Sequence, residues 1–269
     1  MLEKIQQTTS FLKNKIKQTP DFAIILGSGL GNLAETITDS ISIPYKEIPN
    51  FPISTVEGHA GELIFGNLSG KYVLAMKGRF HFYEGYSMQQ VTFPIRVMSM
   101  LGIKNLIVSN AAGGINPQFR TGSIMMITDH INLFPEHPLR GKNMDFFGPR
   151  FPDMSCAYDP EFRKIALQIA KENQITLHQG VYVGNQGPTF ETPAEYRYFH
   201  TIGGDAVGMS TVPEVIVANH CGMRVFALSV ITNEGLSDQI NSHEEVQENA
   251  NLTQPNMTTI IKGVIKRGN

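Results

Sequence analysis

The sequence predicts an α/β fold in which a central mixed β-sheet, flanked by helices, forms a single domain over residues 1–269. Short apolar runs alternate along the chain with segments of helical periodicity, which is typical of this class. A length of 269 residues and a hydrophobic content of 41% suffice for one large core. No internal repeat, low-complexity tract or linker divides the chain, so one domain is the simplest organisation.

The first half of the chain predicts one helix followed mainly by strands. Leu2, Ile5 and Leu12 fall on one helical face, and Pro20 ends that helix. Ser69 and Gly70 separate two apolar runs, which predicts a hairpin. The elements expected here are a helix at residues 2–18, strands at 22–26, 62–68, 71–78 and 105–110, and a helix at 88–102 that Pro94 kinks.

The second half contains a long segment rich in Pro, Gly, Asn and Phe, and irregular segments of this length are usually functional or poorly ordered. Pro193 and Pro213 each suit the first turn of a helix. The elements expected are strands at residues 123–129, 179–183 and 224–233, an irregular segment at 130–158, and helices at 160–173, from 193, at 212–222 and at 241–266.

The charge balance argues against nucleic acid and anionic membrane surfaces as main partners. Lys and Arg total 22 and Asp and Glu total 24, which gives a formal net charge of −2. Charged residues make up only 17% of the chain, compared with about 25% in an average soluble domain. Subunit interfaces produce such a shortage of surface charge, so we expect an oligomer.

Cysteine usage and the N-terminal sequence favour a cytoplasmic protein. Cys156 and Cys221 match neither a disulfide framework nor a zinc motif, and unpaired thiols fit a reducing compartment. The N-terminal segment lacks the apolar core of a secretory signal, and no run of 18 apolar residues is present. The eight histidines show no metal-ligand spacing, and no G-x-S-x-G motif supports a hydrolase.

Several polar or glycine-rich segments follow predicted strands, where ligands bind in open α/β sheets. The glycines of residues 27–31 allow backbone N–H groups to approach an anion. Asn32 replaces the last glycine of a dinucleotide loop and no P-loop lysine is present, so the segment suits either a phosphate or an ordinary turn. Arg79, His81 and Tyr83 would share one face if their strand continues, which favours a phosphate site over a structural ion pair.

Two further segments suit a flat heterocycle. Phe190 places a ring beside the Glu191 carboxylate, although residues 192–193 also read as a helix cap. Asn233 ends a strand with an amide that both donates and accepts hydrogen bonds. His243 begins a predicted helix and faces either solvent or a ligand hydroxyl.

Two more segments have both a functional and a structural interpretation. Ser210 precedes a predicted helix, where it is equally suited to contact an anion or to cap the helix. The small residues 110–114 leave room for a ligand against the backbone, but a close helix–strand crossing would need the same residues.

Eight motifs then occur in order along the chain: GSGLG (27–31), EGHAGELIFG (57–66), KGRFHFYEGY (77–86), SNAAGGIN (109–116), FPDMSCAYD (151–159), GPTFETPAEYR (187–197), DAVGMSTVPE (205–214), and SVITN (229–233) with SHEEV (242–246). Together they resemble purine nucleoside phosphorylase of the trimeric type, over about residues 20 to 265. The resemblance implies a phosphorylase/hydrolase-like fold with a partly barrel-like sheet. It also implies the phosphorolysis of inosine and guanosine to free purine and ribose 1-phosphate.

The same resemblance implies roles for individual residues, with inorganic phosphate as co-substrate and without a cofactor or metal. Those assigned to phosphate are Ser28, Arg79, His81, Asn110, Ala111 through its amide, Ser210, and His59 as a cover. Those assigned to the nucleoside are Glu191 and Asn233 on the purine edge, Phe190 on its face, Val207 in the wall, and Tyr83, Met209 and His243 at the ribose. Those expected to act in catalysis are Asn233, Glu191, His81 and His243. Phe147 is expected to reach into a neighbouring subunit's site, which implies a homotrimer.

These roles agree with the chemistry of breaking a C–N glycosidic bond, which creates a cationic sugar and an electron-rich purine. Asn233 would donate to the N7/O6 edge as negative charge grows there, and Glu191 would accept from N1–H. The phosphate dianion would act as nucleophile and stabilise the sugar cation. An amide at position 233, rather than a carboxylate, favours 6-oxopurines over 6-aminopurines.

Other interpretations stay open at this stage. A methylthioadenosine phosphorylase ranks second, because such enzymes carry an acidic residue in the region of Asn233 and lack the GMSTVPE motif; a preference for xanthosine is also compatible. A non-catalytic nucleoside-binding protein and a nicotinamide-dependent dehydrogenase are the remaining classes. Glu234 replaces a basic residue of mammalian members, which leaves the contacts of the 234–245 lid open.

Overall fold

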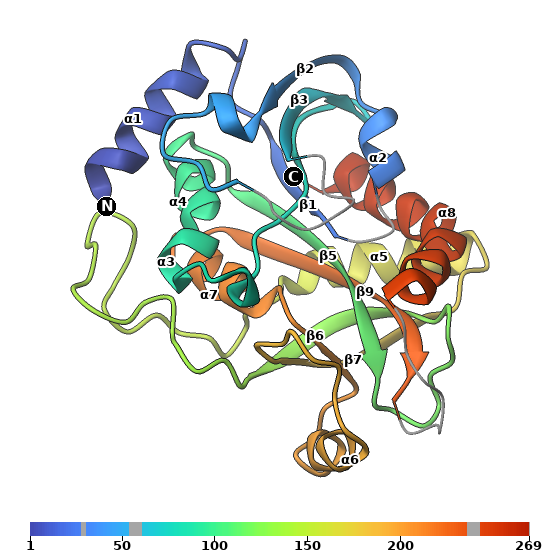
Figure 1. The fold of residues 1–269 in the computed structure, drawn as a ribbon. Coiled ribbons are helices and arrows are strands. Elements are labelled where there is room, and N and C mark those ends of the chain that lie inside the picture. The colour runs from blue at the N-terminus through green and yellow to red at the C-terminus, as the bar shows by residue number, and fades with distance from the viewer. Residues whose placement is uncertain (28–30, 54–60, 236–242, 269) are drawn as a thin grey trace.

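A computed structural model of the chain describes residues 1–27, 31–53, 61–235 and 243–268 (Figure 1). Its strands are β1 (Phe22–Leu26), β2 (Thr38–Pro44), β3 (Glu62–Leu68), β4 (Lys71–Lys77), β5 (Asn105–Gly114), β6 (Ile124–Asn132), β7 (Leu177–Gly184), β8 (Ala206–Gly208) and β9 (Arg224–Glu234). Its α-helices are α1 (Leu2–Lys13), α2 (Gly31–Glu35), α3 (Met88–Val91), α4 (Phe93–Met100), α5 (Pro160–Glu172), α6 (Pro193–Thr201), α7 (Val212–His220) and α8 (His243–Arg267).

The strands form one mixed sheet that is partly closed. Its order is β2-β3-β4-β1-β5-β8-β7-β6-β9, and β5 pairs additionally with β9. This extra pairing closes β5 to β9 into a barrel, while β1 to β4 extend from β5 as an open wing. The predicted α/β class and the partly barrel-like mixed sheet are therefore confirmed.

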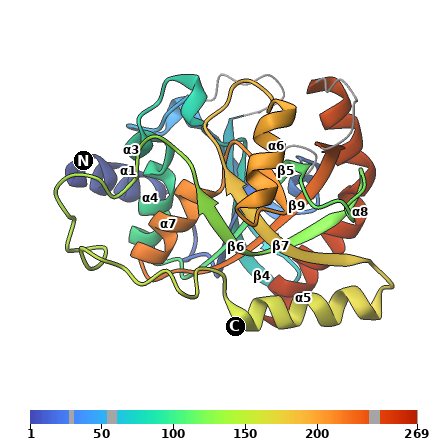
Figure 2. The same ribbon diagram turned by 90° about the horizontal axis from the view of Figure 1, so that it is seen from below.

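The core lies on both faces of the sheet. Alternate side chains of β1 enter different apolar clusters, with Ala23 and Ile25 in one and Phe22 and Ile24 in the other. Helices α1, α3, α4 and α7 cover the first face, and α5 and α8 pack together on the second (Figures 1 and 2). Burial on both sides explains why the strand sequence is continuously apolar rather than alternating.

Most predicted elements are present with shifted ends. The hairpin is confirmed, because Leu68 pairs with Lys71 across Ser69 and Gly70, whose φ angles are 54° and 83°. The turn therefore has the two positive φ angles that match the twist of a two-residue hairpin. The irregular segment is confirmed from residue 133, since β6 runs on to Asn132.

Two helix predictions were wrong in detail. The first helix ends at Lys13 rather than at residue 18, because Ile16 is the one residue of 13–18 that is even partly buried, and no apolar face remains to hold further turns. The predicted helix with a kink at Pro94 is instead two helices that break at Thr92. Pro94 lies in the first turn of α4, where its missing N–H needs no partner.

Strand β5 changes partner along one of its edges, and this change leaves a short part of that edge without a neighbouring strand. Ile25 of β1 pairs with Val108, and the next partner on that edge is Val207 of β8, opposite Gly113. On the other edge β5 pairs with β9 along its length. Residues 109–112 therefore have a backbone edge that β1 and β8 both leave uncovered. The prediction that the strand ends at residue 110 was wrong, because pairing with β9 carries it through the small residues to Gly114.

Candidate active site

A pocket lies where β5 is uncovered, at the carboxyl end of β4 and beside β8. Its wall contains eleven of the residues predicted for the site: Arg79, His81, Tyr83, Asn110, Ala111, Phe190, Glu191, Val207, Met209, Ser210 and Asn233. It also contains residues that were not predicted: Ala112, Gly113, Tyr196, Gly208, Thr232 and Val246. Residues far apart in the sequence thus meet in one cavity.

Four predicted residues are not among those that line the pocket. Ser28 and His59 lie outside the described residues, and so does the side chain of His243, whose backbone begins α8. Val246, one turn further along α8, reaches the pocket wall. Phe147 is 8% exposed in the single chain and its ring lies 5.1 Å from the Arg96 guanidinium carbon. Its reach into a neighbouring subunit stays a prediction.

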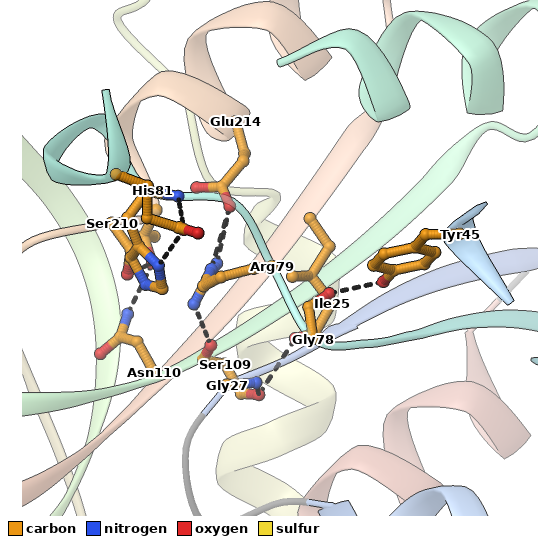
Figure 3. Close-up of polar contacts among 12 residues, drawn as sticks. Ile25, Gly27, Tyr45, Gly78, Arg79, His81, Ser109, Asn110, Ser210 and Glu214 are labelled. Carbon is orange, nitrogen blue, oxygen red and sulfur yellow. Dashed lines mark hydrogen bonds and ion pairs between the residues drawn. The ribbon is translucent and has the colours of Figure 1, made fainter. Parts of the chain in front are cut away.

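Arg79 is buried and held from two sides at one end of the pocket (Figure 3). Its Nε and Nη2 donate to one oxygen of Glu214, Oε1, at 3.1 and 2.9 Å, and its Nη1 donates to the Ser109 carbonyl at 2.7 Å. Ser109 belongs to the uncovered edge of β5, so the guanidinium occupies the place of a missing strand partner. The Tyr45 hydroxyl donates to the Gly78 carbonyl at 2.6 Å and fixes the residue before Arg79.

His81 and Tyr83 reach the pocket by a different route from the one predicted. Strand β4 ends at Lys77, so alternation does not place them; instead the 3-10 helix Phe82–Glu84 follows His81. The rings of His81 and Tyr83 stack with centroids 4.7 Å apart. The Glu84 carboxylate accepts from the His81 backbone N–H at 2.7 Å and lies 3.2 Å from Nδ1.

Protonation of these two rings follows from their burial. Burial lowers the pKa of His81 below 6.5, and the bond to Glu84 opposes this shift. Because a carboxylate only accepts, Nδ1 carries the imidazole proton and Nε2 is the acceptor in the neutral ring. Burial also raises the pKa of Tyr83 to about 12, so its hydroxyl keeps its proton near neutral pH.

The N-terminus of α7 brings Ser210 and Asn110 together through a strained residue. Thr211 has φ 72° and ψ −55°, and the Val212 N–H donates to the Ser210 carbonyl at 2.8 Å, which closes a three-residue turn. A β-branched residue at positive φ is rare and costs energy. Its hydroxyl accepts from Asn110 Nδ2 at 2.8 Å and lies 3.2 Å from Ser210 Oγ. Asn110 Oδ1 is buried and has no partner within the described residues.

The other end of the pocket carries a carboxylate and an amide. Burial raises the pKa of Glu191, and its Oε1 is buried with no hydrogen-bond partner in the described part of the chain. Asn233 is buried, and its Nδ2 donates to the Tyr196 hydroxyl at 3.1 Å. Phe190 is partly exposed at the rim. These groups suit a flat ligand that has both donors and acceptors on its edge.

Two functional side chains, Tyr196 and Glu214, were missed by the sequence reasoning. Both lie in the motifs given above and in the first turns of predicted helices. Helix capping was a sufficient explanation of these segments, so neither residue was assigned a role. Glu214 could have been found from the rule that a buried arginine such as Arg79 needs an acidic partner. Tyr196 had no local signal, because its partner Asn233 is distant in the sequence.

Searches for other kinds of site were negative within the described ranges. No group of three or more His, Cys, Asp or Glu side chains is arranged to hold a metal ion there. In the same residues, no helix has the length and apolar character needed to cross a membrane.

Comparison with known proteins identifies the class to which this fold and pocket belong. The family model of the phosphorylase superfamily matches residues 21–266. The chain is 52% identical over 267 residues to purine nucleoside phosphorylase 1 of Bacillus subtilis (strain 168), covering 98% of each chain.

Solved structures agree. Schistosoma mansoni purine nucleoside phosphorylase in complex with inosine has a TM-score of 0.94 at 46% identity and covers 98% of this chain and 96% of its own. The complex of that enzyme with adenosine has the same TM-score and identity, with 99% and 98% covered. This chain therefore belongs to the purine nucleoside phosphorylases of the phosphorylase superfamily.

Proposed function

We propose that the protein catalyses the reversible phosphorolysis of 6-oxopurine ribonucleosides and deoxyribonucleosides, such as inosine and guanosine. The products are the free purine and ribose 1-phosphate or its deoxy form, which makes the enzyme a pentosyltransferase of purine salvage. The observation that carries the proposal is the polarity of one pocket. A buried arginine lies at one end, and a carboxylate with an amide lies at the other.

The arginine end suits a phosphate dianion. A guanidinium has a planar set of donors that matches phosphate oxygens, and the Glu214 and Ser109 contacts hold it in one orientation. Neutral His81 offers Nε2 as an acceptor for the hydroxyl of hydrogen phosphate. The Ser210 hydroxyl and the amide of Ala111 add donors to the same end, and we propose that Ser28 and His59 complete it.

The carboxylate end suits the purine. Glu191 accepts from N1–H, and Asn233 donates to O6 and accepts from N7 when that nitrogen gains a proton. Phe190 and Val207 enclose the ring, while Tyr83, Met209 and His243 contact the ribose. Glu191, Asn233, His81 and His243 are the residues that act on the reacting groups.

The reaction then proceeds by transfer of the sugar between two held groups. A phosphate oxygen forms a bond to C1′ while the C1′–N9 bond breaks, and the electron pair of that bond passes into the purine ring. The purine leaves as the neutral base after it takes up a proton. Donors aimed at the charge that develops on the base stabilise the transition state, and losing one typically costs about 10²–10³ in rate. Phosphate supplies the nucleophile, so the proposal includes no cofactor or metal.

The decisive experiment follows hypoxanthine release from inosine with and without inorganic phosphate. We expect release that requires phosphate and yields ribose 1-phosphate in equal amount. Release without phosphate would make the protein a hydrolase, and binding of inosine without release would make it a binding protein. Methylthioadenosine is the comparison substrate, and faster cleavage of it than of inosine would contradict the 6-oxopurine preference.

We also propose that residues 1–269 form one catalytic domain that assembles as a cytoplasmic homotrimer. Exposed aromatic side chains next to Phe147 support assembly, since Phe146 is 69% exposed and Phe151 is 88% exposed in the single chain. Cys156 and Cys221 are both unbridged thiols, which suits a reducing compartment. Sedimentation equilibrium tests the trimer, with an expected mass three times the 29.8 kDa of one chain; a monomeric mass for the active enzyme would contradict it.

A further inference from the structure

Tyr196 is a buried polar group of the pocket that the proposed chemistry does not use. It lies in the first turn of α6, is 2% exposed and lines the pocket beside Glu191 and Asn233. Its hydroxyl accepts from Asn233 Nδ2 at 3.1 Å. Burial, and with it the nearby charge of Glu191, raises the pKa of the phenol. The hydroxyl therefore keeps its proton at neutral pH and contacts Asn233, one of the two side chains assigned to the purine.

The backbone around Tyr196 is shaped to hold its ring. A Cβ atom on Gly113 would lie 2.5 Å from the Tyr196 hydroxyl oxygen, and one on Gly235 would lie 1.8 Å from its Cε1. Both distances are far below van der Waals contact, so any larger residue at either position would displace the ring. The phenol thus occupies a slot formed by β5 and the end of β9, and its position is part of the fold.

The hydrogen bonds of Tyr196 determine which way the Asn233 amide points. Asn233 Nδ2, the donor atom of the amide, lies 3.1 Å from the phenol oxygen, so that oxygen accepts on this side. This contact requires Nδ2 rather than Oδ1 on that side. Thr232 Oγ1, 3.3 Å from Oδ1, is placed to donate to the opposite side of the amide. These two contacts therefore set the orientation of an amide that would otherwise be able to rotate.

We infer that Tyr196 is a specificity-determining positioning residue, which holds Asn233 in the orientation that reads a 6-oxopurine. In this orientation the second Nδ2 hydrogen serves an acceptor such as O6. A 6-amino group is a donor and would need the rotated amide, with Oδ1 in that place. The inference rests on the proposed function, since it assigns the selectivity of the same purine-binding end.

The test is Tyr196→Phe, which removes the hydroxyl and keeps the ring in its slot. The readout is the ratio of the inhibition constants of adenine and hypoxanthine against inosine phosphorolysis. Hypoxanthine should bind about 3- to 10-fold more weakly, the worth of one hydrogen bond. Adenine should bind as well as before or better, because the amide is able to rotate. The KM for phosphate should not change.

The control is Tyr198→Phe on the same helix, where the side chain is 53% exposed, and both inhibition constants should stay at their wild-type values. In an Asn233→Ala background, Tyr196→Phe should no longer change the ratio. An equal loss for both bases, or an unchanged ratio in a folded Tyr196→Phe enzyme, would overturn the inference. A wild-type protein without phosphorolysis would instead refute the proposed function, so the two failures are distinguishable.

Discussion

At the scale of single residues, the site depends on a charge that is buried and oriented before any ligand arrives. Arg79 and Glu214 have side chains that are 3% and 4% exposed, so solvent screens their interaction very little. One carboxylate oxygen accepts both bonds from the guanidinium, while Oε2 is buried with no partner in the described residues. Such a pair adds little net stability over an apolar pair, but it leaves a costly buried charge when one partner is removed. Its main effect is to hold Arg79 in place.

Replacement of Glu214 by Gln should therefore destabilise the fold and weaken phosphate binding. The free energy of unfolding, measured by urea denaturation, should fall by about 3–5 kcal/mol, because Arg79 keeps a buried charge without its counter-charge. The KM for phosphate should rise, since an amide oxygen accepts the two guanidinium hydrogen bonds more weakly than a carboxylate and holds Arg79 less firmly. The matched control is Glu172→Gln, which breaks the ion pair with Arg267 at the surface and should cause no measurable change. Similar effects for the two variants would contradict the argument.

At the scale of elements, patterns that depend on neighbouring residues were predicted and patterns that depend on distant partners were not. The apolar run of β1 and the turn residues of the hairpin at Ser69 are local sequence patterns that suffice to predict these elements. Strand β2 is an exposed edge strand with a largely polar sequence, and β8 is three residues long, so neither has a local signal. The small residues at the end of β5 are poor strand formers that pairing with β9 holds extended.

The candidate site shows the same division. Arg79, Glu191 and Asn233 follow or end elements with clear patterns, so their place at one end of the sheet could be predicted. The contribution of the uncovered edge of β5 could not be predicted, because this edge results from a change of strand partner. His81 and Tyr83 were correctly predicted to belong to the site, but the predicted reason was wrong, because strand β4 ends at Lys77 and the two rings stack instead.

Helix α6 carries Tyr196 and begins two residues after Glu191, so its N-cap should control nucleoside binding if these residues hold the purine as proposed. Thr192 Oγ1 accepts from the Glu195 N–H at 3.2 Å, and Glu195 Oε2 accepts from the Thr192 N–H at 2.7 Å. Thr192→Val removes the side-chain acceptor of this cap, which leaves the Glu195 N–H without its partner at a cost of about 1 kcal/mol. Because Glu191 precedes the cap and Tyr196 follows it, the KM for inosine should rise about fivefold, while the KM for phosphate stays unchanged in steady-state assays.

Ser87→Ala is the matched control for the cap of α6. Ser87 forms the same kind of capping box with Gln90 at the start of α3, so it should lower stability without a change in the KM for inosine. If Thr192→Val lowered the melting temperature and left that KM unchanged, α6 would not position the purine end.

At the scale of the whole molecule, the pocket needs the closed sheet, since its walls come from residues between Arg79 and Val246. The chain must therefore form the closed sheet, and bury side chains on both of its faces, before the pocket exists. Among these groups are His81, His130 and His220, and burial lowers the pKa of each. His130 Nδ1 lies 3.0 Å from the buried Tyr158 hydroxyl. The folded protein thus holds these imidazoles neutral at a pH where the unfolded chain would protonate them.

This difference predicts that the fold loses stability at mildly acidic pH. A histidine with a lowered folded pKa contributes stability that is complete above the unfolded pKa of about 6.5 and is lost as the pH falls below it. Each such group adds a slope of at most about 1.4 kcal/mol per pH unit to the free energy of unfolding. Glu191 works in the opposite sense, because burial raises its pKa and the folded state takes up that proton more readily. Denaturation between pH 7.5 and pH 5.5 should therefore show a falling stability whose slope is smaller in His130→Gln. A stability that is constant over this range would show that burial does not hold these imidazoles neutral.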